Sequence, residues 1–429
     1  MKVFLYDEFN PQDIAMMQAL YSRSPESVTK HVEKVRQTGS GKFMERFYVG
    51  YGHASIADCG STTLFIEGVS MLAAKAIEDW PLFSGQESSS RYIDYSKQTL
   101  GDPIGTLASK KILDSWMAFY IASLPKVEEH LMAKYPRKDG EDEGVYKKAI
   151  KARAFDIMRG FLPAGVHTQL SWHTNLRQAG DKLFLLKHHP LKEVRDLAEK
   201  IHAELFAKYP HSFGHKFSDE QENYRKYLQS KYNYFFNADV PEFKMKTNIK
   251  TSELNKYKDI FAKRPEKTGL PNFLAELGNV TYDFLLDFGS FRDIQRHRNG
   301  VCRMPLLTTK LGFNEWYLAE LPEAVRKEAN GLIKEQKKAI VALKTDKETA
   351  QYYTAMGFNV SCRVTYGLPA AVYVMELRSG RPVHPTLRKV AHKMHAALKK
   401  AFPLMKTHPD LALTDWDVKR GLQDIRERK

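Results

Sequence analysis

The sequence predicts an α+β fold made of two tandem repeats, each with a mixed or antiparallel sheet flanked by helices. The chain has 429 residues, which is too long for one small hydrophobic core. Similar segments recur in the same order in its two halves, as expected after a duplication. Helix-like and strand-like stretches are mixed without regular alternation, which favours α+β over a βαβ-type fold.

The recurring segments define the repeats. FLPAGV at 161–166 and GLPAAV at 367–372 share Leu-Pro-Ala-x-Val, and each is followed by a His-Pro pair and a basic, helix-like run. Upstream, FIEGVSMLAAKAIEDW at 65–80 parallels NVTYDFLLDFGSFRDIQRH at 279–297. The predicted repeats are residues 1–225 and 226–429.

Single elements follow from the periodicity of apolar residues. HTQLSWHT at 167–174 predicts a strand, and AAVYVMEL at 370–377 is a nearly continuous apolar run that predicts a buried strand. Residues 386–402 have the pattern of an amphipathic helix. A helical face is also predicted within 279–297 by the spacing of Val280, Phe284, Phe288 and Phe291.

Composition excludes several classes of protein. Apolar residues make up 43% of the chain and charged residues 27%, and no apolar run reaches the roughly 18 residues of a membrane helix. The first residues lack a basic and then apolar leader, and Cys59, Cys302 and Cys362 form no CxxC pair. These features predict a cytoplasmic protein without a membrane partner or a disulfide framework.

The net charge of +15 predicts an anionic partner. Nucleic acid, acidic membranes and phosphorylated small molecules all fit this charge, and composition alone does not separate them. No helix-turn-helix, zinc-knuckle or aromatic RNA-binding pattern occurs, so we do not expect nucleic acid to be the partner. The histidines form no ligand set with carboxylates or cysteines, and no metal site is predicted.

Two short motifs carry groups that bind anions. Arg296-His297-Arg298 follows a helix-like pattern. At a helix end these cations could complement the dipole, or the arginine forks could bind phosphate. SGQESSSRY at 84–92 places four serines, a glutamine and an arginine close together, as a polar surface loop or as a phosphate-binding loop.

Together, the two motifs resemble the signature of the flavin-dependent thymidylate synthases. That signature is Arg-His-Arg, two residues, Ser, one residue, Asn, two residues, Ser, one residue and Arg-Tyr. The second repeat has its first half at 296–298, where NGVCRMPLL at 299–307 replaces the serine-rich half. The first repeat has Asp79-Trp80-Pro81 in place of the cationic triplet. It keeps the serine-rich half as Ser84, Gln86 for Asn, Ser89, Arg91 and Tyr92.

The resemblance continues outside the signature. GHASIADCG at 52–60 is similar to the family's Gly-His-x-Ser segment, and RGFLPAGVHTQLSWHTNLR at 159–177 to its Arg-x-x-Leu-Pro and Asn-x-Arg stretch. MELRSGRPVHP at 375–385 resembles its Leu-Arg and His segment, with two extra residues that make Arg381 a rival for Arg378. His53 is as well explained by a structural hydrogen bond as by contact with flavin or folate.

The resemblance implies a function and a set of site residues. The reaction would be FAD- and folate-dependent transfer of one carbon to C5 of a pyrimidine nucleotide, most simply dUMP to dTMP, with methylenetetrahydrofolate and NADPH as co-substrates. The implied catalytic residues are Arg91, Arg159 and Arg296. The implied substrate-binding residues are Ser84, Gln86, Ser89, Arg91, Tyr92, Arg159 and Arg378. The implied cofactor-binding residues are His53, Asn175, Arg177, Arg296, His297, Arg298 and His384.

Two alternatives stay open at the level of sequence. A diverged flavoprotein of the same fold could act on another nucleotide, move another one-carbon unit or lack catalysis. A basic nucleic-acid-binding protein would account for the charge alone. No cysteine lies in a nucleophile motif. One-carbon transfer to the pyrimidine would therefore depend on arginines that stabilise charge on its ring, and on a flavin for the redox chemistry.

The split signature implies a composite site. In the family, sites lie between subunits of a homotetramer, so a fused pair of repeats needs only one copy of each half-motif at a site. Two chains would then form a homodimer of four repeats. The abandoned site would be lined by Asp79, Trp80, Pro81 and Cys302. The sequence does not decide whether the surviving half-motifs meet within one chain or across the dimer.

Overall fold

The computed structural model describes residues 8–50, 52–215, 217–232, 241–304, 306–412 and 414. The chain forms two compact units. Unit 1 comprises residues 1–69, 73–87 and 169–232, and unit 2 comprises 70–72, 88–168 and 233–429. These units do not coincide with the predicted repeats, because residues 88–168 of the first repeat belong to unit 2. The boundaries 1–225 and 226–429 therefore stay a prediction about duplication.

Unit 1 is built around a three-stranded sheet of order β1-β3-β2. Its strands are β1 (Ser61–Ser70), β2 (Ser84–Glu87) and β3 (His167–Asn175), and β2 pairs antiparallel with β3. Near the N-terminus, Met16 and Met17 pack against Val32 and Val35. The helices of this part of the chain are α1 (Pro11–Tyr21), α2 (Val28–Thr38), α3 (Gly41–Phe43), the π-helix Met44–Gly50, α4 (Ala54–Ala57), α5 (Met71–Glu78), α8 (Leu176–Leu186), α9 (Lys192–Lys208), the 3-10 turn Pro210–Ser212 and α10 (Asp219–Tyr232).

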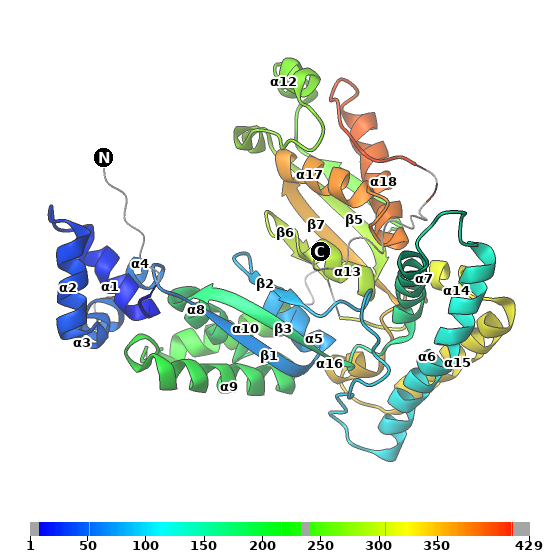
Figure 1. The fold of residues 1–429 in the computed structure, drawn as a ribbon, viewed down its shortest axis with the longest axis horizontal. Helices are drawn as coiled ribbons and strands as arrows, with labels where there is room; N and C mark the ends of the chain where they lie inside the picture. Colours follow the sequence, from blue (N-terminus) through cyan, green and yellow to red (C-terminus); the bar gives the residue numbers. More distant parts are fainter. Residues whose placement is uncertain are drawn as a thin grey trace. The chain divides into compact units, whose positions relative to one another are not determined.

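Unit 2 contains an antiparallel four-stranded sheet of order β4-β5-β7-β6. Its strands are β4 (Phe243–Thr247), β5 (Asn279–Asp287), β6 (Val301–Arg303) and β7 (Asn359–Gly367). Helices α17 (Leu368–Ser379) and α18 (Pro385–Ala401) lie side by side across β5 and β7 (Figure 1). The remaining helices are α6 (Leu107–Lys134), α7 (Glu143–Met158), α11 (Thr251–Asn255), α12 (Lys258–Lys263), α13 (Phe288–Gln295), α14 (Glu315–Ala319), α15 (Glu323–Ala342), α16 (Lys347–Ala350) and the 3-10 turns Arg159–Phe161, Asn272–Leu277 and Gln351–Tyr353.

This architecture confirms the α+β class and the antiparallel sheets with flanking helices. The strand predicted at 167–174 is β3, and the helix predicted at 386–402 is α18. Among the described residues, no helix is both long and apolar enough to span a bilayer.

Two predicted elements are wrong. Residues 370–377 lie in α17, which is a helix and not a strand. Most of this helix is buried, so its residues 368–375 are apolar without an amphipathic period. The predicted helical face in 279–297 is also wrong for residues 279–287, which form β5. Because β5 is buried on both faces, its apolar residues match the helical spacing by coincidence.

The segments that were paired as repeats behave differently in the structure. In 65–80 a strand leads directly into a helix, β1 into α5, and in 279–297 β5 leads in the same way into α13. The Leu-Pro-Ala pairing is not structurally equivalent, however. Residues 161–166 precede strand β3, whereas 367–372 end strand β7 and begin helix α17.

Local sequence explains where the helices of the site begin. The side chain of Asp287 accepts a hydrogen bond from the backbone N–H of Ser290 at 2.8 Å and caps α13. Asp142 caps α7 through the N–H of Val145 in the same way. Proline stands in the first turn of α17 and of α18, where it lacks no helical hydrogen bond. The position at which each helix begins therefore sets which residues lie at the ends of α7, α13 and α17.

Candidate functional site

Arg91 is held by a bidentate ion pair in unit 2. Its Nε and Nη2 donate to the two carboxylate oxygens of Asp156 at 2.7 and 3.1 Å, and Nη2 also donates to the carbonyl of Pro382 at 3.0 Å. Asp156 lies on α7 and is fully buried. A fork-to-carboxylate pair of this geometry fixes the orientation of the guanidinium group.

Arg159 follows α7 and is only 2% exposed. Its Nη2 donates to Ser290 Oγ at 2.8 Å, and its Nη1 lies 3.9 Å from Asp293 Oδ2. Its Nε has no hydrogen-bond partner among the described residues. Arg159 is therefore a buried cation whose donors are only partly used.

Ser290 links Arg159 to His384. Its hydroxyl lies 3.1 Å from His384 Nδ1 and 2.7 Å from Thr386 Oγ1. His384 Nε2 lies 3.2 Å from the carbonyl of Asp156, which can only accept, so this nitrogen carries the proton. Burial, followed by the charge of Arg159, holds the pKa of His384 well below its usual range. His384 is thus a neutral, fully buried member of the network.

Asp293, on α13, lies among four arginines. Its carboxylate is 3.9 Å from Arg159 Nη1 and 3.9 Å from Arg296 Nη1, and its backbone carbonyl accepts from Arg378 Nη2 at 2.7 Å. Burial acts to raise the pKa of Asp293, but the charges of Arg159, Arg91, Arg296 and Arg378 outweigh it and lower that pKa. We call Arg91, Arg159, Arg296 and Arg378 the arginine cluster.

The Arg296-His297-Arg298 triplet begins at the C-cap of α13, as the sequence predicts. Arg296 has a side chain that is 46% exposed. His297 Nε2 accepts from Arg378 Nε at 2.7 Å. Burial, followed by the charge of Arg378, lowers the pKa of His297 to about 3, so the ring is neutral at physiological pH. Arg298 donates to the carbonyl of Arg296 at 3.3 Å.

The structure thus brings Arg91, from the serine-rich half of the signature, together with Arg296 and His297, from its cationic half, within unit 2 of one chain. Arg91 and Arg159 come from the first predicted repeat, and Arg296, His297 and Arg378 from the second. Arg381 is separate from them: its side chain is 49% exposed and pairs with Asp410 at 3.2 Å. The geometry therefore favours Arg378 over its rival.

Other predicted residues lie elsewhere or have local roles. Ser84 and Gln86 are on β2 of unit 1, opposite His173 and Ser171 of β3. Ser89 accepts from the backbone N–H of Arg91 at 3.3 Å. The remaining residues from the implied sets are Tyr92, which is 41% exposed, Asn175, which caps α8 through the N–H of Gln178, and His53, which precedes α4.

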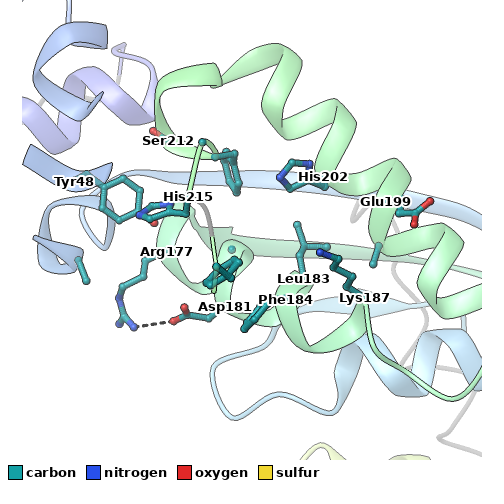
Figure 2. Close-up of a pocket in the computed structure, with 16 residues that line it drawn as sticks. Tyr48, Arg177, Asp181, Leu183, Phe184, Lys187, Glu199, His202, Ser212 and His215 are labelled. Carbon is teal, nitrogen blue, oxygen red and sulfur yellow. Dashed lines mark hydrogen bonds and ion pairs between the residues drawn. The ribbon is translucent and has the colours of Figure 1, made fainter. Parts of the chain in front are cut away.

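Arg177 lies at a cavity of about 720 Å³ within unit 1. Its Nε donates to Asp58 at 2.8 Å and its Nη1 to Asp181 at 3.1 Å. Figure 2 shows the pair with Asp181 at the same end of the cavity as Tyr48 and His215. The wall is rich in rings, namely Tyr48, Phe184, His202, Phe213, His215 and Phe217.

The opposite end of this cavity carries Lys187 and Glu199 (Figure 2). Lys187 also pairs with Glu222 of α10 at 2.8 Å. The rings of Phe184 and Phe217 stack with centroids 3.7 Å apart. Among the described residues, no group of three or more His, Cys, Asp and Glu side chains could hold a metal ion.

Sequence reasoning missed the acidic partners of the cluster. Asp156 and Asp293 lie three residues before Arg159 and Arg296, in the segments DIMR at 156–159 and DIQR at 293–296. An aspartate and an arginine at this spacing share one face of a helix. The recurring Asp-Ile-x-Arg pattern was therefore a usable signal. No local sequence pattern indicated Ser290, because its hydrogen bond to α18 depends on the packing of α13 against that helix.

Residues 4–211 match the model of the family described as thymidylate synthase complementing protein. This match spans just under half of the chain. The family predicted from the two half-motifs is thereby confirmed.

Relatives extend the similarity through both halves of the chain. A UPF0159 protein of Chlamydia muridarum is 26% identical over 424 residues, covering 85% of this chain and 80% of the relative. A UPF0159 protein of Thermoplasma acidophilum is 24% identical over 469 residues, covering 91% of this chain and 93% of the relative. A flavin-dependent thymidylate synthase of Helicobacter pylori, solved with FAD and dUMP, is 18% identical and covers 48% of this chain and 94% of its own, with a TM-score of 0.31.

Proposed function

We propose that this protein transfers one carbon to C5 of a pyrimidine nucleotide with the help of FAD, most simply converting dUMP to dTMP. Methylenetetrahydrofolate would supply the carbon and NADPH the reducing equivalents. The observation that carries the proposal is the arginine cluster, in which residues from both half-motifs of the family signature lie around Asp293 in one unit.

The arginine cluster has the charge and the donors for a nucleotide phosphate. Arg296 is half-exposed and can reach an incoming anion, while Arg378 is oriented by His297 and by the carbonyl of Asp293. Neutral His297 accepts from Arg378, so its proton is on Nδ1 and adds no competing charge. Guanidinium groups fixed in this way would also stabilise negative charge that develops on a pyrimidine ring nearby.

The unit 1 cavity fits a flavin. Its volume of about 720 Å³ lies within the usual range for small-molecule sites, and its ring-rich wall suits a planar heteroaromatic group. Arg177 at one end and Lys187 at the other each offer a cation to an anionic group of the cofactor, and the residues of this chain would bind and orient the cofactor there. A bound flavin supplies hydride once it is reduced.

The first test is spectroscopic. The purified protein should be yellow, and dUMP with methylenetetrahydrofolate should oxidise its NADPH-reduced flavin. Mass spectrometry after incubation with a panel of pyrimidine nucleotides then identifies the product. A colourless protein that takes up no FAD would exclude the proposal.

Arg177→Ala should weaken FAD binding about ten- to hundredfold, through loss of a charge-assisted hydrogen bond. Arg23→Ala, on the exposed surface of unit 1, is the matched control.

A second test separates nucleotide from flavin binding. Arg91→Ala should impair dUMP binding while the flavin spectrum is kept, and Arg91→Lys should rescue little because a point charge does not replace a bidentate fork. Arg381→Ala should change neither, since this side chain pairs with Asp410 outside the cluster. Loss of FAD with unchanged dUMP affinity in Arg91→Ala would reverse the assigned roles.

A flavoprotein of the same fold with another substrate is the second candidate. It is favoured by the unit 1 segment Asp79-Trp80-Pro81, where the family signature has Arg-His-Arg. Here Trp80 Nε1 donates to Gln178 at 2.8 Å, and Lys182 donates to the carbonyl of Asp79 at 2.8 Å. Both hydrogen bonds lie within unit 1. The nucleotide panel distinguishes this candidate, because the mass gained by the product reports the carbon unit transferred.

We also propose that the chain arose by duplication and pairs as a homodimer of four repeats. Because the cluster residues from both predicted repeats lie in one unit of one chain, each chain would hold its own nucleotide site. Mixing Arg91→Ala with Arg378→Ala protein should therefore restore no activity. Restored activity in the mixture would mean that the site is shared across chains, and light scattering measures the assembly directly.

A further inference from the structure

Two carboxylates serve the arginine cluster in different ways. Asp156 binds Arg91 through two hydrogen bonds of 2.7 and 3.1 Å. Asp293 instead lies 3.9 Å from both Arg159 and Arg296, beyond hydrogen-bond length. Asp156 is fully buried, whereas the Asp293 side chain keeps 14% exposure. Asp156 is thus hydrogen-bonded to its arginine, whereas the Asp293 carboxylate offsets the charge of Arg159 and Arg296 without accepting hydrogen bonds from them.

Donors in the cluster are left for a ligand. Arg159 is 2% exposed, yet its Nε has no hydrogen-bond partner among the described residues. A buried, unsatisfied donor of this kind is costly unless something accepts from it. Arg296 projects 46% of its side chain into solvent and forms the open side of the cluster. The site therefore holds cations that Asp293 balances in charge but does not fully bind.

The charges are compatible with a phosphate group. Asp293 lies among four guanidinium groups, Asp156 pairs with that of Arg91, and the buried carboxylate of Asp287 lies near Arg159 beside Gly289. Buried like charges repel strongly when no counter-ion is present. A phosphomonoester dianion could take over that balance, because arginine forks match its oxygens.

We propose that Asp293 is a built-in counter-ion of a phosphomonoester site: it neutralises the arginine cluster when the site is empty and is displaced from the guanidinium groups when phosphate binds. This inference rests on the proposed function and adds how the nucleotide site is kept stable without its ligand. The α13 backbone stays in place, because the carbonyl of Asp293 holds Arg378 whichever way the side chain points.

The test is Asp293→Asn, with Asp156→Asn as the matched control. Isothermal titration with inorganic phosphate, and separately with dUMP, measures the affinity of the full-length protein. Asp293→Asn should bind both about tenfold more tightly, because the competing charge is gone. Asp156→Asn should bind them more weakly, because Arg91 loses the partner that orients it.

Thermal unfolding provides a readout that is independent of activity. Without anion, Asp293→Asn should melt below the wild type, and phosphate should raise its melting temperature more than that of the wild type. Unchanged or weaker phosphate binding by Asp293→Asn would overturn the proposal, since Asp293 would then organise the arginines rather than compete for them.

A second variant keeps the idea testable if Asp293→Asn does not fold. Asp293→Glu retains the charge and extends it further toward the arginines, so phosphate and dUMP should both bind more weakly. Equal or tighter binding would count against the proposal. Neither measurement needs flavin or turnover, so failure of one-carbon transfer and failure of the counter-ion idea give different results.

Discussion

Two segments of the chain have the same local architecture and opposite chemistry. In one, β1 leads into α5 and then into Asp79-Trp80-Pro81, and in the other, β5 leads into α13 and then into Arg296-His297-Arg298. Trp80 is bonded to Gln178, and Lys182 covers its ring at 5.6 Å. In the second segment, Arg296 is half-exposed and its neighbours surround Asp293. The strand–helix segment thus positions a triplet in both cases, and the surroundings differ: Trp80 is hydrogen-bonded within unit 1, whereas Arg296 is half-exposed beside Asp293.

The largest effect is expected for Arg159→Met. This substitution removes a buried cation and leaves Asp293 and Ser290 without it, which should lower the free energy of unfolding by about 3–5 kcal/mol. Urea unfolding measures the loss, and dUMP binding should disappear with it. Arg381→Met is the control, because its exposed pair with Asp410 should contribute less than about 1 kcal/mol. Similar losses in the two variants would contradict the assigned burial of Arg159.

The next effect concerns Lys182, beside the tied triplet. Burial lowers the pKa of Lys182 to about 8, against the favourable charge of Asp79. Between pH 8 and about 10.5 the unfolded chain then holds a proton that the folded chain has lost, so stability should rise with pH by up to about 3 kcal/mol. Lys182→Met should remove that rise. If the wild type and the variant respond alike above pH 8, Lys182 does not titrate as described.

His297 should respond on the other side of neutrality. Its folded pKa of about 3 lies below the ordinary value near 6.5. Below pH 6.5 only the unfolded state gains this proton. The free energy of unfolding should therefore decrease by up to about 1.4 kcal/mol for each unit by which the pH is lowered, or by about 2 kcal/mol at pH 5. His297→Gln keeps an acceptor for Arg378 and cannot be protonated, so it should lose less stability over this range. Burial lowers the pKa of His384 in both proteins, so its contribution cancels and the difference is specific to His297.

The sequence predicts the arginines of the site better than the groups around them. Short motifs singled out Arg91, Arg159, Arg296 and Arg378, and the structure brings these four residues together around Asp293. Their surroundings depend on contacts between distant segments, such as the hydrogen bonds from α13 to His384 and Thr386, and single-sequence periodicity does not report these. Asp156 and Asp293 are an intermediate case, since the Asp-Ile-x-Arg spacing was visible.

The same limit applies to the fold. The α+β class follows from mixed patterns, but burial on several faces hides the period that separates helix from strand. This is why α17 resembled a strand and β5 resembled a helix. Pro369, in the first turn of α17, was the local signal for the correct assignment, because proline is favoured at the start of a helix and excluded from a central strand.

The smallest effect is expected for Trp80→Phe, which tests how firmly the unit 1 triplet is tied down. Phenylalanine keeps a ring for Lys182 and loses only the N–H donor to Gln178, so the cost should be about 1 kcal/mol. The double-mutant cycle with Gln178→Met isolates this bond, since Gln178 keeps the hydrogen bond from its backbone N–H to the Asn175 side chain. A coupling energy of about 1 kcal/mol is expected from urea unfolding. Strictly additive losses would mean that Trp80 is held by packing alone, and the contrast with the arginine cluster would then depend on shape rather than on hydrogen bonding.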